Sequence, residues 1–216
     1  REMLWQAAPG NLVSVLAPAQ DGAFLAGLWD GRIILYEKDG RVRWTAEMND
    51  GVSCLAVSAD GAFIAAGSYG GQLQIFDTAG KARWMRDLGS GITRLAFASH
   101  KNDLFVASRD FGLLHIRVDD QHIYWRKNLG MPILELLVSA NDRRLWTSGS
   151  DHRICCFNKN DDLHLRGDYS LPGVKGGQLY PFSKEGSLAC FYSSTGGLVF
   201  VDHRKKLLTC ETDASV

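Results

Sequence analysis

The side chains best suited to bind a metal are grouped in one stretch of the sequence and two distant positions: Asp151, His152, Cys155, Cys156, His203 and Cys210. Thiolates, imidazoles and carboxylates of this kind bind zinc. In a strand, neighbouring side chains point to opposite faces, so Cys155 and Cys156 cannot both reach one ion without a distortion. No Cys-x-x-Cys pair accompanies them. We therefore expect no metal site and no cofactor.

A run of small residues at 193–197, Ser-Ser-Thr-Gly-Gly, is the nearest approach to a nucleophile or phosphate loop. The Gly-x-Ser-x-Gly elbow and the Gly-x-x-x-x-Gly-Lys-[Ser/Thr] pattern are both missing, which favours an inter-strand turn. The acidic residues are dispersed over predicted turns rather than paired on one face. No catalytic constellation emerges, and we expect the protein not to be an enzyme.

These residues lie on a chain organised by an internal repeat. Four tryptophans are separated by 39, 40 and 41 residues, and each is followed eight residues later by a β-branched aliphatic. The pairs are Trp5 with Val13, Trp44 with Val52, Trp84 with Ile92 and Trp125 with Ile133. Segments 12–48 and 51–88 also share an Asp-Gly-Ala-Phe core and a Gly-x-x-x-Trp tail. Recurrence at this period indicates a repeat architecture.

Each unit divides at turn residues into four runs of strand length. In the second unit the runs are Val52 to Val57, Ala62 to Gly67, Gln72 to Phe76 and Ala82 to Arg86. The Asp-Gly and Gly-Gly dipeptides between them favour tight hairpins, because Gly takes positive φ without a Cβ clash. Units 91–129, 131–169 and 174–211 keep this skeleton, although the last two lack the tryptophan.

A four-stranded sheet cannot bury both of its faces alone, and radial stacking of such sheets gives a propeller. We therefore expect an all-β fold: a β-propeller of about five four-stranded antiparallel blades, in one domain over residues 1–216. An ordinary β-sandwich with coincidental tryptophan spacing is the alternative. The regular spacing assigns Trp5, Trp44, Trp84 and Trp125 to structural contacts between blades.

The segment Leu55 to Gly61, continuing through Ala65–Ser68 to Phe76-Asp77, resembles a WD40 repeat. The tails Gly40–Trp44 and Gly80–Trp84 resemble the outer strand of quinoprotein-like repeats. The resemblance covers nearly the whole chain and implies a protein-binding scaffold or regulatory domain. No Gly-His dipeptide precedes any unit, so the usual His–Asp contact of WD40 blades is not expected. Turn residues Asp30, Asp110 and Asp151 are then hairpin residues.

Turns between the second and third strands of each unit should emerge on one rim of the propeller. They carry bulky side chains where Gly, Asn, Asp and Ser usually prevail, and Trp, Tyr and Arg dominate interface hot spots. We expect a partner-binding rim formed by Trp29, Tyr69, Arg109, Phe111 and His152. The alternative is that each aromatic only packs on its neighbouring blade.

A second function from another class is a small-ligand sensor or propeller enzyme with its site at the channel mouth. Glu135, Arg94 and His152 are the residues that could serve it. Glu135 could equally line a water-filled axis. A third reading is a periplasmic or envelope assembly factor, as in other quinoprotein-like propellers.

Charge and composition narrow the partners. Lys plus Arg and Asp plus Glu both number 24, so the summed charge gives no long-range attraction to nucleic acid. No apolar run approaches the roughly 18 residues that span a bilayer. Five cysteines are an odd number and four lie in apolar runs, which favours reduced thiols. We expect a protein partner and a cytoplasmic location, with a periplasmic one as the alternative.

Both ends of the chain resemble outer strands. Residues 1–8, with Trp5 within Met3 to Gln6, look like the outer strand of a preceding blade, while Leu207 to Glu211 supplies that of the fifth unit. A simple interlock of the termini is then not available. Three arrangements stay open: further blades in a longer chain, a closed ring of five, and association of two chains through open blade edges.

Overall fold

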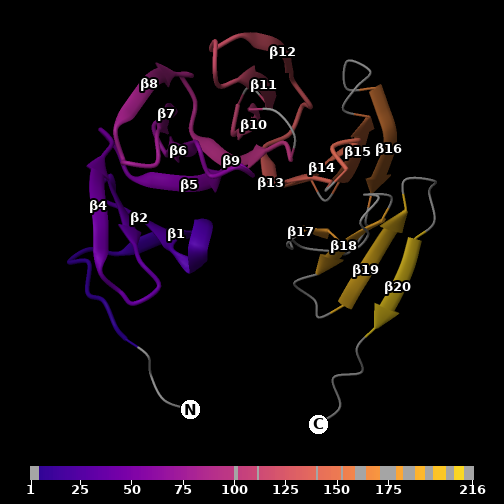
Figure 1. Ribbon diagram of the computed structural model, residues 1–216. Helices are drawn as coiled ribbons and strands as arrows, with labels where there is room; N and C mark the ends of the chain where they lie inside the picture. The colour runs from indigo at the N-terminus through magenta and orange to yellow at the C-terminus, as the bar shows by residue number, and fades with distance from the viewer. Residues whose placement is uncertain are drawn as a thin grey trace.

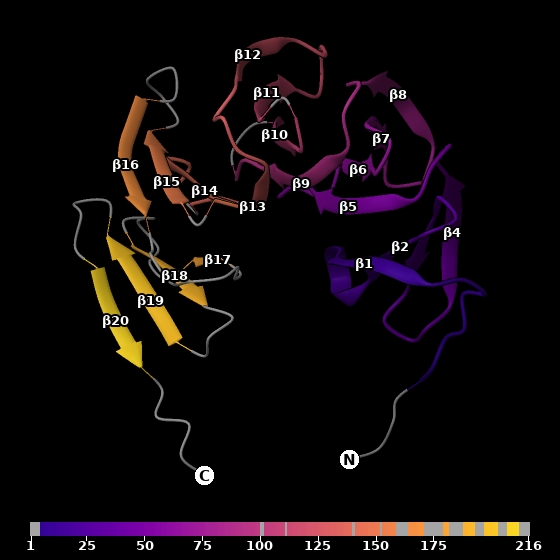
Figure 2. The ribbon, with the colours of Figure 1, turned by 180° about the vertical axis from the view of Figure 1, so that it is seen from behind.

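The computed structural model describes residues 5–99, 102–110, 112–139, 141–151 and 153–158, and after these the strand residues alone. The described chain is all-β, with five four-stranded antiparallel sheets and one short 3-10 turn, η1 (Gln20–Gly22). Figures 1 and 2 show the sheets standing in an arc, with the first strand of each sheet toward its centre. The predicted all-β fold of propeller blades is confirmed.

Each sheet is a meander in sequence order, and we number the sheets as blades 1 to 5. Blade 1 contains β1 (Val13–Pro18), β2 (Phe24–Leu28), β3 (Arg32–Tyr36) and β4 (Val42–Glu47). Blade 2 contains β5 (Val52–Val57), β6 (Ile64–Ser68), β7 (Gln72–Phe76) and β8 (Ala82–Asp87). Blade 3 contains β9 (Ile92–Phe97), β10 (Asp103–Ser108), β11 (Leu113–Arg117) and β12 (Ile123–Lys127). Blade 4 contains β13 (Ile133–Val138), β14 (Arg144–Gly149), β15 (Arg153–Asn158) and β16 (His164–Ser170). Blade 5 contains β17 (Leu179–Pro181), β18 (Leu188–Tyr192), β19 (Gly197–Asp202) and β20 (Leu207–Glu211).

The strands of blade 2 test the sequence pattern most directly. Strands β5 and β7 have the predicted bounds, and β8 extends one residue further. Strand β6 begins later than predicted because the turn before it is longer. There the Ser58 hydroxyl donates to the Asp60 carboxylate at 2.6 Å and accepts from the Phe63 N–H at 2.9 Å, which holds Ala62 and Phe63 in the turn.

The N-terminal segment differs from its expected form. Within its described part, Trp5 to Leu12 is not in a strand. A strand is stabilised by hydrogen bonds to a neighbouring strand, and β4, the outer strand of blade 1, pairs with β3 and not with this segment. The Trp5 side chain nevertheless contacts blade 1 as the outer-strand Trp44 contacts blade 2, because each indole N–H donates to a carbonyl of that blade.

The hydrophobic core is divided among the interfaces between blades. The cluster between blades 1 and 2 joins Leu25, Ile33 and Leu35 to Val52 and Leu55. Corresponding clusters lie between blades 2 and 3 and between blades 3 and 4. Each blade is therefore stabilised mainly by its neighbours, as expected when a single sheet cannot form a core of its own.

The β-branched residues eight positions after Trp44 and Trp84 have a structural role at the contact between blades. A Cβ built on Gly27 of blade 1 would lie 2.6 Å from a methyl group of Val52, and one on Gly67 of blade 2 would lie 2.7 Å from a methyl of Ile92. The bare backbone of one blade thus receives the branched side chain of the next. The spacing records a contact between successive blades.

A hydroxyl clasp joins the inner strands. The Ser14 hydroxyl donates to the carbonyl oxygens of Gly27 in its own blade, at 2.9 Å, and Val52 in the next, at 2.5 Å. Ser53 repeats the arrangement with Gly67 and Ile92, at 3.0 and 2.6 Å. One hydroxyl proton is shared between two carbonyls, so each serine ties two blades together near the axis.

Ser53→Ala is expected to lower the free energy of unfolding by about 1 kcal/mol, because two carbonyls lose their shared donor. The matched control is Thr93, at the same position of blade 3, whose buried Oγ1 has no hydrogen-bond partner in the part of the chain that the structure describes. Thr93→Val should be neutral or slightly stabilising, since it removes an unsatisfied group and keeps the shape. Urea unfolding of both variants checks this; equal destabilisation would mean that the clasp contributes nothing specific.

Candidate binding surface

The turns between the second and third strands lie at equivalent places in four blades. In each, the residue after the second strand donates its backbone N–H to a carbonyl just before the inner strand. The four bonds are Trp29 to Leu12, Tyr69 to Gly51 and Arg109 to Gly91, each 3.0 Å, and Ser150 to Pro132, 3.1 Å. The structure therefore presents Trp29, Tyr69 and Arg109 from successive blades on one rim.

Trp29 and Tyr69 stack on each other across blades 1 and 2. Their ring centroids are 4.5 Å apart and the planes differ by 9°. Trp29 nevertheless remains 52% exposed. The pair therefore fits both alternatives drawn from the sequence. Its rings pack across the junction of two blades, and Trp29 also exposes aromatic surface that a partner could contact.

The turn aspartates have local partners. The Asp30 carboxylate accepts from the Arg32 side chain at 2.8 Å, and this hydrogen bond lowers the pKa of Asp30. Asp151 pairs with Arg153 two residues on, at 2.5 Å. Asp110 accepts from the Ser90 hydroxyl at 2.9 Å, and that hydroxyl accepts from the Asp110 N–H at 3.1 Å. All three act within or beside their own hairpins.

A pocket of about 400 Å³ opens beside the rim, toward the inner strands. We call it the mouth pocket; it is lined by Ser53, Tyr69, Gly91, Ile92, Thr93, Arg94, Arg109, Leu134 and Glu135. It brings together two residues expected on the rim, Tyr69 and Arg109, and two expected at the channel mouth, Arg94 and Glu135. Sequence reasoning had treated these as separate sites.

Arg94 and Glu135 form a two-pronged ion pair across blades 3 and 4. The Arg94 Nη2 and Nε atoms lie 2.6 and 3.1 Å from the two carboxylate oxygens, and Nη1 donates to the Thr93 carbonyl at 2.7 Å. The hydrogen bond to Glu135 raises the pKa of Arg94. Bidentate pairs of this geometry orient both groups. Both carboxylate oxygens of Glu135 therefore already accept hydrogen bonds from Arg94 of the same chain.

The charges around the rim are uneven. Within the described residues, the guanidinium of Arg109 makes no ion pair, while Arg94 in the same pocket is neutralised by Glu135. A second pocket of about 230 Å³, on the side of blade 2, is lined by Asp50 and Asp87 with Asn49, Ser68, Gly70, Gln72 and Met85. Tyr69 itself lines the mouth pocket with Arg109, and its chain neighbours Ser68 and Gly70 line the pocket that contains Asp50 and Asp87.

Two of the expected rim residues, Phe111 and His152, lie outside the described residues. Three of the four expected structural tryptophans contact the blade that follows them in the chain. The indole N–H groups of Trp5, Trp44 and Trp84 donate to carbonyls of Lys38, Thr78 and Val118 in the following blade, at 2.9, 3.1 and 2.9 Å. Trp125 lies against Phe105 and His115 of its own blade.

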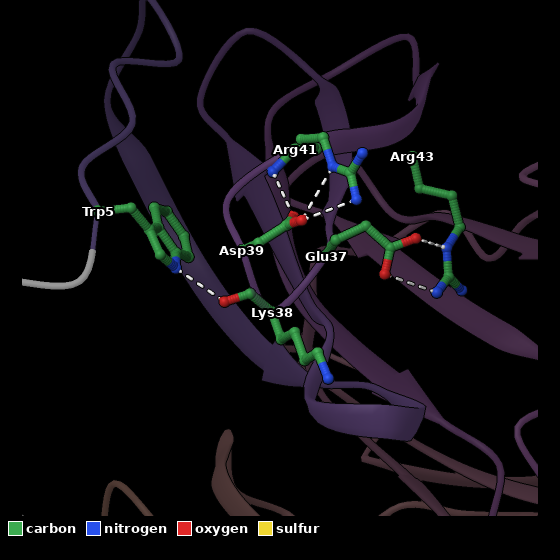
Figure 3. Close-up of polar contacts among 6 residues, drawn as sticks. All are labelled: Trp5, Glu37, Lys38, Asp39, Arg41 and Arg43. Atoms are coloured by element: carbon green, nitrogen blue, oxygen red, sulfur yellow. Dashed lines mark hydrogen bonds and ion pairs between the residues drawn. The ribbon is translucent and has the colours of Figure 1, made fainter.

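Figure 3 shows the Trp5 contact with its surroundings. On the same outer turn Glu37 pairs with Arg43 and Asp39 with Arg41, and the hydrogen bond to Arg43 lowers the pKa of Glu37. These pairs are exposed, where ion pairs contribute little. Trp5 also stacks on Phe24, at 5.3 Å between ring centroids, and this apolar contact is the more important one for holding the segment on blade 1.

Burial limits the reactivity of the described cysteine thiols. Cys54, Cys155, Cys156 and Cys190 are buried. Burial raises the pKa of the Cys54 thiol to about 12, which keeps it protonated and unreactive near neutral pH. Among the described residues no group of three or more His, Cys, Asp and Glu side chains is placed to hold a metal. The side chains of His203 and Cys210 lie outside the described residues.

Sequence reasoning missed two features. One is the serine clasp, although a hydroxyl residue directly follows the β-branched position at Ser14 and Ser53. His115 was also missed: it is buried, stacks between Phe105 and Tyr124, and lies 3.5 Å from Asp103. The equivalent positions of blades 1, 2 and 4 hold Leu35, Ile75 and Cys156, so no repeat signal marks this histidine.

Comparison with known families supports part of this picture. Residues 41–77 match the family model described as WD domain, G-beta repeat. The match begins at the outer strand of blade 1 and ends just after β7 of blade 2, so it spans one blade-to-blade step. A search of curated proteins found no match. The described part of the chain has no helix long and apolar enough to cross a membrane.

Proposed function

We propose, from the WD40 repeat at residues 41–77, that this protein is a non-catalytic propeller scaffold that binds a protein partner over its rim. WD40 domains commonly mediate protein binding. The observation that carries the proposal is the half-exposed Trp29, held rigid against Tyr69 at the junction of two blades. An aromatic that is already ordered loses little entropy on binding, which is a property of interface hot spots.

The neighbouring groups support a protein partner. Arg109 supplies a cation that is unpaired within the described residues, and the mouth pocket beside it has room for one or two side chains of a partner. Asp50 lies with Ser68 and Gly70, the chain neighbours of Tyr69, in the second pocket. An aromatic centre with charged groups of both signs nearby resembles the anatomy of specific protein interfaces. The odd number of cysteines, four of them in apolar runs, favours reduced thiols, and we propose the cytoplasm.

A small-ligand site in the mouth pocket is the second candidate, favoured by the volume of about 400 Å³. Such pockets usually place a few polar groups to orient a ligand. Here Arg94 and Glu135 would have to part before either could bind one, because each is the partner of the other. The protein-binding proposal requires no such rearrangement.

The double variant Trp29→Ala with Tyr69→Ala is expected to weaken partner binding by at least about 2 kcal/mol, roughly 30-fold, because it removes the aromatic centre of the surface. Proteins retained by the tagged wild type from an extract of the source cells would be identified by mass spectrometry. Their affinities for wild type and variant would then be measured by calorimetry.

Val42→Ala is the matched control, since Val42 is 55% exposed on the outer strand β4, away from the rim. It should bind as wild type does. A folded double variant that retains every partner at full affinity would refute the proposed rim. If ligand binding is instead lost in Glu135→Gln and unchanged in Trp29→Ala, whose side chain does not line the mouth pocket, the small-ligand function is correct.

A further inference from the structure

The turn between β10 and β11 differs from those of blades 1 and 4 in the place of its arginine. In blades 1 and 4 the turn aspartate pairs with an arginine two residues later, at 2.7 and 2.5 Å. In blade 3 the aspartate is Asp110, and Gly112 stands two residues later. Asp110 instead accepts a hydrogen bond from the Ser90 hydroxyl, at 2.9 Å. Arg109 precedes this aspartate, is exposed, and makes no ion pair in the described part of the chain.

The mouth pocket therefore carries one positive charge that its own lining does not neutralise. Two guanidiniums and one carboxylate line the pocket. The carboxylate is that of Glu135, which accepts from Arg94 through both oxygens and whose side chain is only 17% exposed. Because this pair is neutral as a whole, the remaining charge is that of Arg109. A cation beside apolar protein attracts an anion more strongly than a cation in open solvent does.

The other large side chains of the pocket are apolar or aromatic. They are Tyr69, Ile92 and Leu134, and Leu134 is 39% exposed. Apolar surface of this kind favours the methylene groups of an incoming side chain, because their contact with it removes both from water. The pocket of about 400 Å³ thus offers room for a short aliphatic stem and a cation for an anionic end.

We propose that the mouth pocket receives an aspartate or glutamate side chain of the protein partner, and that Arg109 binds its carboxylate. This inference rests on the proposed function and adds the chemistry of the partner to it. The planar guanidinium donates two parallel hydrogen bonds to a carboxylate, which gives the contact direction as well as charge. The single charge of the carboxylate matches the single charge that the lining leaves over.

A phosphorylated side chain matches the pocket less well. Its charge is about −2, and the proteins that recognise it gather several arginines around it. Here the second arginine, Arg94, is already paired, and the Glu135 carboxylate in the same pocket would repel a dianion. The charges of the lining therefore favour a carboxylate over a phosphate.

Tyr69 connects this pocket to the aromatic pair, since it lines the pocket and stacks on Trp29 at 4.5 Å between ring centroids. A partner segment that places its carboxylate beside Arg109 consequently continues over Trp29. We therefore expect the acidic residue to lie close in sequence to an apolar or aromatic residue of the partner, which covers the exposed part of Trp29.

Selection from a phage-displayed library of random peptides on the immobilised full chain tests this. The peptides are fused to the phage through their C-terminal ends, so a selected carboxylate comes from a side chain. Wild type should select peptides enriched in Asp and Glu, whereas Arg109→Glu should lose this preference and favour Lys and Arg. The matched control is Arg83→Glu, the same change at an exposed position of the outer strand β8, which should select as wild type does.

Calorimetry with one selected peptide then tests the contact itself. Replacing its acidic residue by the corresponding amide should lower its affinity for wild type at least about 10-fold, and should have little effect on its affinity for Arg109→Gln. Arg109→Lys, which keeps the charge, should retain part of the difference. Phosphoserine in place of the acidic residue should bind no tighter than that residue does.

The inference is overturned if wild type selects no peptides, if the selected peptides are not acidic, or if Arg109→Glu keeps the acidic preference. A phosphoserine peptide that binds tighter would refute the choice of a carboxylate. Failure of the proposed rim gives a different result: acidic peptides would then bind Trp29→Ala as tightly as wild type, while still depending on Arg109.

Discussion

Gly71→Ala is expected to lower the free energy of unfolding by about 3 kcal/mol, roughly 6–12 °C in Tm. Gly71 has φ of +102°, which an alanine adopts at a cost of about 1 kcal/mol or more. An added Cβ would also lie 2.7 Å from the nitrogen and 2.8 Å from the carbonyl oxygen of Ser90, both rigid backbone. Forcing such a contact apart costs a further 1–3 kcal/mol, by analogy with an overpacked core.

Gly89→Ala separates the two contributions. Gly89 also has positive φ, +73°, but a Cβ there meets no atom within 4 Å. Its substitution should cost only about 1 kcal/mol, the conformational part alone. Urea unfolding of the two variants measures the difference. If both substitutions lower the free energy of unfolding equally, the backbone around Ser90 moves away from the added Cβ at no cost.

Trp146→Ala should destabilise the protein by about 3–5 kcal/mol, the usual range for deleting a buried tryptophan. Trp146 lies on β14 of blade 4 and, at 1% exposed, is among the largest fully buried side chains described. Removing the indole leaves a cavity that the stiff sheet cannot close. Trp146→Phe, which fills most of that space, should cost less than half as much.

Trp29→Ala provides the contrast, because half of the Trp29 side chain is already in water. We expect it to cost about 1 kcal/mol, mainly the stack on Tyr69. Thermal and urea unfolding of the three variants would check the order. If Trp29→Ala destabilises the protein more than Trp146→Ala does, the main role of Trp29 is structural rather than in binding.

The fold was predictable from the sequence because its signals are periodic. Tight turns at Asp-Gly and Gly-Gly set strand bounds such as those of β5 and β7, and the tryptophan period set the blades. Trp146 escaped this reasoning, since it falls outside that period. Its burial depends on how blade 4 packs, which no local pattern of residues records.

The site was predictable only in part. The position of a turn in a repeat fixes where its backbone emerges, and this placed Trp29, Tyr69 and Arg109 on one rim. Pairwise geometry across blades is set by tertiary packing. The Trp29 stack, the Arg94–Glu135 pair and the pocket shared by Tyr69 and Glu135 therefore became visible only in three dimensions.

The serine clasp and the outer tryptophan together attach one blade to the next at two points, one near the axis and one at the periphery. Two separated attachments resist twisting, where a single one would act as a pivot. Together with the hydrophobic cluster between the blades, Ser14 and Trp44 fix how blade 1 packs on blade 2, the junction across which Trp29 stacks on Tyr69. Residues outside the rim therefore contribute to the shape of the surface that a partner would contact.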